Sequence, residues 1–315
     1  MDCLGLFAYG RRKFFVTIFR SFIFVRNLIL FARQDRVALQ SIRRQRIHIP
    51  SRTARRSITA DLYSPPGSRS NTAEPRPVLV NWHGSGFIIP LLGTDYLFCD
   101  RVARDLGVFV IDADYRKSPE YLFPGALEDV EDVLKWVASQ SHRFDVSRVA
   151  VSGFSAGGTL ALVAASALRR ETPELTIPAV VAFYPITNMT LAPEARDVPH
   201  PQKPLPPFLM ELFFDSYAPD KTMRADPRVS PAMADPADYP STVVMLTADG
   251  DTLSPEGDAL AMTLDDGTRT VVHRSFKGAR HGFDSRRAEE GSMAGQQREE
   301  AYTLATNALK EAFAL

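Results

Sequence analysis

Five near-continuous apolar runs, separated by helical patterns, constrain the fold of this 315-residue chain more than any other feature. Apolar runs of this kind are typical of strands that are covered on both faces. Between two of them, residues 124–140 place Ala126, Val130 and Val137 on one face of a helix and carboxylates on the other. Strands that alternate with helices predict an α/β fold with a mostly parallel central sheet and helices on both of its faces. The runs cover residues 77–84, 107–116, 148–155, 179–185 and 241–250.

Two further segments stand outside this alternation. Residues 46–66 predict two short strands, which end at a Pro-Pro-Gly turn. Residues 187–236 are rich in proline and contain the helical stretch PPFLMELFFDSYA between two predicted core strands. An insertion of this length inside a compact domain is usually functional. We therefore expect residues 1–45 and 187–236 to form a helical cap over a core made of residues 46–186 and 237–315.

Residues 11–34 predict a helix with an unusual polar pattern. Lys13, Arg20, Asn27 and Gln34 recur every seven residues and give one narrow polar stripe on an otherwise apolar cylinder. Such a helix either covers an apolar pocket, as the N-terminal part of the cap, or associates with a membrane surface. The polar interruptions, with no small-residue cleavage pattern after them, leave a transmembrane anchor and a transit peptide as weaker alternatives.

The overall composition excludes some classes of protein and leaves others open. The net charge is zero, so nothing in the total indicates nucleic-acid binding, although residues 1–58 carry an excess of eleven positive charges. Two cysteines, Cys3 and Cys99, cannot form a disulfide framework, which favours a cytoplasmic location. The chain has no metalloprotease helix, dinucleotide fingerprint or P-loop pattern, so we expect neither a metal nor a cofactor. The oligomeric state stays open.

The frame Gly153-Phe-Ser155-Ala-Gly157 follows a predicted strand and precedes a predicted helix. In this setting a strained turn pushes the serine hydroxyl out above the sheet, where it can act as a nucleophile. The flanking glycines are needed because strand and helix come too close together for side chains. The alternative interpretation is that the small residues only let the helix pack closely on the sheet.

A serine hydroxyl needs a base to take its proton, and His281 in a loop after the last strand is the candidate. A carboxylate must then hold the histidine, and Asp251 or Asp249 at the end of a buried strand could do so. The chain order serine, aspartate, histidine is that of α/β hydrolases. Glu256 opens the next helix, and we expect it to steady the loop.

Besides the serine, the histidine and the carboxylate, the candidate site includes the loop His83-Gly84-Ser85-Gly86, which follows the first long apolar strand. A tetrahedral intermediate needs two or three N–H donors around its oxyanion. We expect the N–H groups of Ser85, Gly86 and Ala156 to supply them, with His83 and Gly84 supporting the loop. By itself the loop could also be an ordinary β-turn.

Together these motifs resemble the hormone-sensitive-lipase-like branch of the α/β hydrolases, which includes bacterial carboxylesterases, arylacetamide deacetylases and plant gibberellin receptors. The resemblance covers residues 77–285. The oxyanion loop matches the family's His-Gly-Gly-Gly with Ser85 in place of the middle glycine, and Phe154 stands where many members have aspartate. DTLSPEG at 251–257 is similar to the family's Asp-Pro-Leu-x-x-Glu-Gly, which selects Asp251 over Asp249. The remaining matches are DYRKSPEYLFPGALEDV at 114–130, the Gly-Gly pair that ends the serine motif, and HGF at 281–283.

The resemblance implies the α/β-hydrolase fold with a helical cap, and a cofactor-independent serine hydrolase acting on a small-molecule acyl substrate. Ser155 would attack the acyl carbonyl, His281 would carry the proton, and Asp251 would orient His281. Esters or lactones are favoured as substrates over amides, and amidase, formamidase or acyltransferase activity would use the same residues. A non-catalytic ligand receptor is less favoured, because the gibberellin receptors lack the catalytic histidine that is present here. Ser85 and the apolar cap also resemble fungal members of secondary-metabolite pathways.

Overall fold

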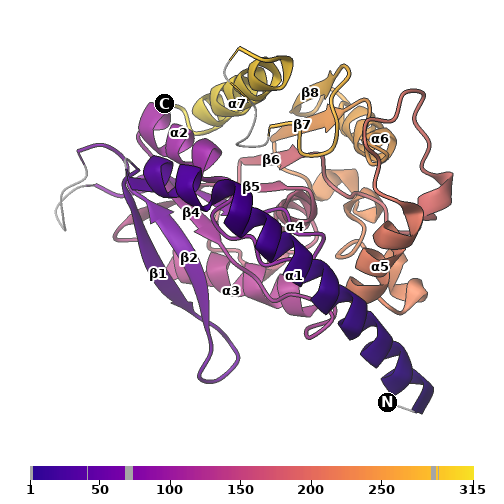
Figure 1. Cartoon of the computed structure of the whole chain (residues 1–315). Coiled ribbons are helices and arrows are strands. Elements are labelled where there is room, and N and C mark those ends of the chain that lie inside the picture. The colour runs from indigo at the N-terminus through magenta and orange to yellow at the C-terminus, as the bar shows by residue number, and fades with distance from the viewer. Residues whose placement is uncertain (1–2, 41, 68–73, 285–288, 290) are drawn as a thin grey trace.

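The computed structural model of the chain describes residues 3–40, 42–67, 74–284, 289 and 291–315, without the side chains of residues 3–4 and 28–40. Within these residues, eight strands form one sheet in the order β1-β2-β4-β3-β5-β6-β7-β8 (Figure 1). The pairs β1–β2 and β2–β4 are antiparallel, and all other pairs are parallel. The strands are β1 Arg44–Pro50, β2 Ser57–Tyr63, β3 Arg76–Trp82, β4 Phe109–Ala113, β5 Phe144–Phe154, β6 Ala179–Phe183, β7 Thr242–Ala248 and β8 Thr270–Phe276.

Helices cover both faces of this sheet, and two hydrophobic clusters fill the space between the layers. Successive side chains of β3 point to opposite faces, so Val78 and Val80 belong to one cluster and Leu79 to the other. α3, α4 and α6 pack on the first face, and α2 and α7 on the second. The predicted α/β fold with a mostly parallel sheet is therefore confirmed. The helices are α1 Cys3–Gln40, α2 Tyr96–Leu106, α3 Gly125–Ser139, α4 Ala156–Ala165, α5 Pro207–Tyr217, α6 Ser254–Leu264 and α7 Met293–Ala312.

The five apolar runs correspond to β3, β4, β5, β6 and β7, and residues 46–66 contain parts of β1 and β2 as expected. The sequence patterns gave no comparable signal for β8. This strand lies at the edge of the sheet beyond β7, and only Phe276 in it is buried. β8 lacks the continuous apolar run of its neighbours, because its sequence includes the polar residues His273, Arg274 and Ser275.

The turn from β5 into α4 is strained at Ser155. This residue has φ 52° and ψ −119°, a conformation that side-chain-bearing residues rarely adopt. Its backbone N–H donates to the carbonyl of Phe183 at 2.8 Å, which ties the turn to β6. A Cβ on Gly157 would lie 1.9 Å from the carbonyl oxygen of Trp82 at the end of β3. The expected strand–turn–helix geometry is present, and backbone contact requires glycine at position 157.

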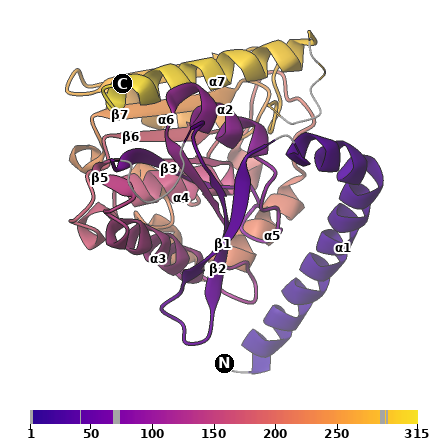
Figure 2. The same ribbon diagram turned by 90° about the vertical axis from the view of Figure 1, so that its left-hand side faces the viewer.

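The first helix lies on the outside of the molecule, beside α5 from the 187–236 segment (Figure 2). The rings of Phe19 and Phe213 join the two helices, with centroids 5.7 Å apart. Arg20 fixes α1 to the body through an ion pair with Glu120 at 2.9 Å. No helix in the described part of the chain is both long and apolar enough to cross a bilayer.

Replacing Gly157 with alanine should destabilise the protein by about 1–3 kcal/mol or more, because the added methyl group meets backbone atoms that cannot move independently. Gly10 in α1 is the matched control, since a Cβ there would meet nothing within 4 Å. Gly10→Ala should leave stability unchanged or slightly raised. Urea unfolding of both variants checks this, and equal midpoints would contradict the close approach described for the turn.

Candidate active site

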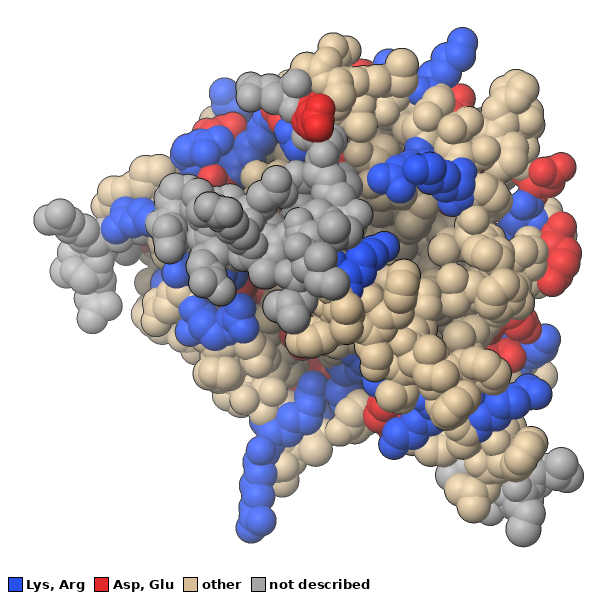
Figure 3. Space-filling view, viewed as in Figure 1, with Lys and Arg blue, Asp and Glu red and all other residues tan. Residues whose placement is uncertain are grey.

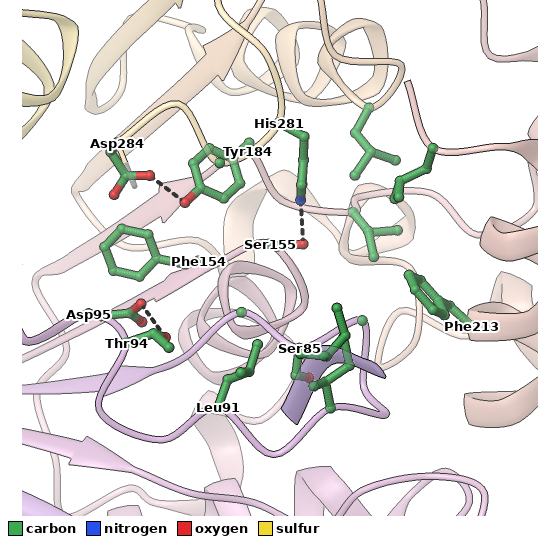
Figure 4. Close-up of a pocket in the computed structure, with 18 of the residues that line it drawn as sticks. Ser85, Leu91, Thr94, Asp95, Phe154, Ser155, Tyr184, Phe213, His281 and Asp284 are labelled. Carbon is green, nitrogen blue, oxygen red and sulfur yellow. Dashed lines mark hydrogen bonds between the residues drawn. The ribbon is translucent and has the colours of Figure 1, made fainter. Parts of the chain in front are cut away.

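Ser155, His281 and Asp251 form a continuous hydrogen-bonded chain. The Nε2 atom of His281 lies 2.9 Å from Ser155 Oγ (Figure 4). Its Nδ1 atom lies 2.6 Å from Asp251 Oδ2. The three residues come from the turn before α4, the loop after β8 and the loop after β7. The other oxygen of Asp251 accepts the N–H of Leu253 at 3.1 Å, which fixes the carboxylate in place. The structure therefore brings together the three residues that the sequence singled out.

The charge of Asp251 controls the basicity of His281. Burial of the imidazole would by itself lower its pKa, but the Asp251 carboxylate and its hydrogen bond outweigh this effect. The pKa of His281 is therefore raised above its ordinary value of 6.5. This environment makes the histidine a better proton acceptor and stabilises the imidazolium that forms when a proton arrives.

Asp249 and Glu256 hold other parts of the same region. Asp249 accepts the N–H of Gly278 at 2.6 Å, so it supports the turn after β8 and does not contact His281. Glu256 lies in the first turn of α6, where it accepts the N–H of Thr187 at 2.8 Å and forms a buried ion pair with Arg196. Its carboxylate therefore anchors the beginning of the 187–236 segment to the helix that follows Asp251.

The glycine-rich loop after β3 lies directly beside the serine. A Cβ on Gly84 would be 3.5 Å from the Cβ of Ser155, and Gly86 has a φ of 55° that favours glycine. Ala156 is the first residue of α4, so its N–H is among those that have no partner within the helix. Loop and helix terminus thus meet at the serine, as an oxyanion site at this edge of the sheet requires.

The side chain of Ser85 is bound within this loop. Its hydroxyl lies 2.5 Å from the Tyr115 hydroxyl, which in turn donates to the carbonyl of His83 at 2.8 Å. The Ser85 hydroxyl also accepts a hydrogen bond from the N–H of Phe87 at 2.8 Å. The fully buried ring of His83 stacks on Tyr115 and lies 3.1 Å from the carboxylate of Asp114. The Ser85 side chain therefore cross-links the loop to the segment after β4.

A cavity of about 430 Å³ opens beside Ser155, a volume typical of sites for small molecules. One end is apolar and is lined by side chains from both segments that the sequence assigned to a cap. Phe19 and Ile23 come from α1, and Phe213 lies on the opposite side of Ser155 from Asp284 and Tyr184 (Figure 4). The further apolar side chains that line the cavity are Ile89, Leu91, Leu97, Phe154, Ile186, Leu205, Met210, Phe214 and Leu253.

The other end of the cavity is polar, and the sequence analysis missed it. Asp284 accepts hydrogen bonds from the hydroxyls of Tyr184 at 2.6 Å and Tyr302 at 3.1 Å, and the Tyr184 ring packs against His281. Burial raises the pKa of the Asp284 carboxyl, although both tyrosines act against this. Burial also raises the pKa of Asp95, and the nearby carboxylates of Asp112 and Asp284 raise it further. Tyr184 directly follows β6, and Asp284 follows His281 by three residues, so their places at the carboxyl edge of the sheet were an available signal.

In the described residues, no group of three or more histidine, cysteine, aspartate and glutamate side chains is arranged to hold a metal ion. The acidic side chains at the polar end of the cavity are instead bound to hydroxyl and amide groups. Asp95 accepts hydrogen bonds from Thr94 at 3.0 Å and Asn81 at 3.3 Å.

The chain is similar to known ester hydrolases. Residues 79–285 match a protein-family model whose description is alpha/beta hydrolase fold. The chain is 31% identical over 230 residues to ethyl acetate hydrolase of Pseudomonas putida, a match that covers 72% of this chain and 71% of that enzyme. It is 36% identical over 118 residues to versiconal hemiacetal acetate esterase of Dothistroma septosporum, covering 36% of each protein. The solved structure of EstE1, a thermophilic carboxylesterase from a metagenomic library, is 31% identical with a TM-score of 0.74 and covers 89% of this chain and 94% of EstE1.

These similarities agree with the geometry. The family match begins in β3 and continues past His281, so it spans the oxyanion loop, the serine turn and the histidine loop. The structural match extends over nearly the whole of both chains. The chain belongs to the hormone-sensitive-lipase-like family of α/β hydrolases and is a carboxylesterase-type hydrolase.

Proposed function

We propose that this hydrolase cleaves carboxylic esters or lactones of small apolar substrates through an acyl-enzyme intermediate on Ser155. Ser155 Oγ attacks the carbonyl carbon while its proton passes to His281 Nε2. The ester C–O bond then breaks, and the departing alcohol takes that proton. Water deprotonated by His281 releases the acid and restores the serine. The observation that carries the proposal is the hydrogen-bonded chain from Ser155 Oγ through His281 to Asp251.

Three backbone N–H groups, those of Ser85, Gly86 and Ala156, stabilise the oxyanion in this proposal. Support comes from the approach of Gly84 to Ser155 and from the position of Ala156 at the start of α4. The partial positive charge at a helix N-terminus favours negative charge there. His83 and Gly84 act indirectly, by fixing the path of the loop.

Residues 1–45 and 187–236 act as the cap in this proposal, and they select an apolar part of the substrate. In support, α1 and α5 contact each other through Phe19 and Phe213, and both rings line the cavity. A cavity of about 430 Å³ accommodates a small molecule.

Other activities receive less support. Amidase, formamidase and acyl-transfer reactions would use the same residues, but the relatives that match this chain are named as ester hydrolases. A non-catalytic receptor is disfavoured by the hydrogen bond between His281 and Ser155. Assignment to a fungal secondary-metabolite pathway is not supported, because the match to the Dothistroma septosporum esterase covers only 36% of this chain.

Ser155→Ala should lower kcat for p-nitrophenyl acetate by at least about 10³-fold while leaving the fold intact, because no other group can form the acyl-enzyme. Ser147→Ala is the matched control, since Ser147 is an exposed serine on β5, the strand that leads into the turn at Ser155. Steady-state kinetics with circular dichroism checks both variants. A folded Ser155→Ala protein with near-native turnover would end the assignment of the nucleophile.

The pH profile of kcat/KM should report His281. Only the neutral imidazole accepts the serine proton, so activity should rise with pH through a pKa above 6.5. Asp251→Asn removes the charge that raises this pKa, so the acid limb should move to lower pH, and kcat should fall by about 10³–10⁴-fold.

Asp249→Asn provides the comparison, because Asp249 bonds to the N–H of Gly278 and not to the histidine. This variant should keep the native acid limb and stay within about tenfold of native kcat, a change of ~1.4 kcal/mol in the barrier. If Asp249→Asn produced the larger loss and the shifted limb, the assignment of Asp251 would be wrong.

Ser85→Ala should lower kcat by about tenfold, a change of ~1.4 kcal/mol in the barrier, with little change in KM. The substitution removes the link between the oxyanion loop and Tyr115 while the backbone donors remain. Tyr115→Phe should have a similar effect, and the double variant should be no worse than the more severe single one. Additive losses, or an effect confined to KM, would show that the hydroxyl does not position the loop.

A further inference from the structure

The outward face of α1 carries an exposed row of large apolar side chains. Phe7, Phe14, Ile18, Phe22 and Val25 are 75%, 61%, 53%, 62% and 50% exposed. Their spacings of seven, four, four and three residues place them on one side of the helix. We call this row the outward stripe. The helix buries Val16 and Ile23 on its opposite side.

Two residues of the polar pattern seen in the sequence, Arg20 and Asn27, point toward the protein instead of toward water. Arg20 donates to Glu120 and to the backbone carbonyls of Ile88 and Ser118, and Asn27 lines the cavity beside Ser155. Because these polar groups are directed inward, the solvent-facing side of α1 consists mainly of apolar residues. Soluble monomers rarely expose continuous apolar patches of this kind, which usually mark a contact surface.

The charges around the outward stripe distinguish between the surfaces that could cover it. Arg11 and Lys13 are exposed, Arg12 lies between them, and the sequence has no acidic residue from position 3 to position 34. Figure 3 looks onto α1, and between its two grey ends the surface is mostly tan with blue side chains. If two copies paired through this face, the patch would meet itself and bring like charges together. An anionic lipid surface has the complementary charge and attracts each nearby basic side chain.

We propose that α1 lies flat on an anionic lipid surface, with the outward stripe inserted at the boundary between headgroups and acyl chains. Helices with an apolar face and basic residues bind membranes in this way without spanning them. The basic residues Arg11, Arg12 and Lys13 contact lipid headgroups, while Arg20 keeps the helix attached to the protein.

The position of α1 connects this surface to the active site. Phe19 and Ile23 line the cavity, whereas Ile18 and Phe22, adjacent to them in sequence, belong to the outward stripe. A protein bound through the stripe would hold its apolar cavity close to the bilayer. The substrates would then be apolar esters dissolved in the membrane, an extension that rests on the proposed esterase function.

The test is flotation of the full-length protein with vesicles of phosphatidylcholine alone or of phosphatidylcholine with 30% phosphatidylglycerol. The native protein should bind the anionic vesicles at least tenfold more tightly. The triple variant Phe14→Ser, Ile18→Ser, Phe22→Ser should lose at least tenfold in binding to them. The triple variant Arg11→Gln, Arg12→Gln, Lys13→Gln should lose the preference for anionic lipid and its sensitivity to salt.

Met262→Ser with Met293→Ser is the matched control, because both methionines are exposed on other helices. This control should bind vesicles as the native protein does. Hydrolysis of a soluble p-nitrophenyl ester should be unchanged in all three variants, since none of the substituted residues lines the cavity. If the native protein bound vesicles but did not hydrolyse the ester, the proposed esterase function would be wrong. The proposed binding of α1 to a lipid surface would still hold.

Two results would overturn the proposal. The first is a native protein that binds neither kind of vesicle. The second is a native dimer in analytical ultracentrifugation that the Phe14, Ile18 and Phe22 substitutions convert to a monomer, with no vesicle binding by either form. That result would assign the outward stripe to a contact between copies of this chain.

Discussion

The close packing of the β5–α4 turn against the end of β3 is the constraint on which the site depends. Gly157 brings the first turn of α4 against the carbonyl of Trp82, and the same approach forces Ser155 into its positive φ. This strain holds the hydroxyl above the sheet edge at the distance that His281 requires. It also sets the start of α4 beside Gly84, so the nucleophile and the oxyanion donors share one rigid frame. In such a frame the reacting groups need little reorganisation during the reaction.

Around this frame, further side-chain contacts hold the loops of the site in place. Ser85 and Tyr115 cross-link the oxyanion loop, a link that glycine at position 85 could not make. Phe154 stacks on Phe183 with centroids 4.2 Å apart, so an aromatic ring lies beside the serine. Glu256 anchors the 187–236 segment to the helix after Asp251. The loop that carries Asp251 and the 187–236 segment, which lines part of the cavity, are therefore joined through Glu256.

The sequence predicted those parts of the structure that depend on local patterns. Buried parallel strands leave continuous apolar runs, and Ser155, Asp251 and His281 occupy positions that chain order and motif context single out. The sequence could not predict features that arise from packing between distant segments. The direction of the Ser85 hydroxyl depends on Tyr115, thirty residues away. The polar end of the cavity depends on three separate loops and on Tyr302 of α7. The polar stripe of the N-terminal helix was visible in the sequence, but only the docked helix shows that its members Arg20 and Asn27 face the protein.

The central claim is that His281 activates Ser155, and covalent labelling with a fluorophosphonate tests it most directly. The probe reacts with a serine whose hydroxyl has a working base, and peptide mass spectrometry locates the modified residue. We expect rapid modification of Ser155 in the native protein and loss of that modification in folded His281→Ala. Labelling of another serine, or equal labelling of Ser155 without His281, would contradict it.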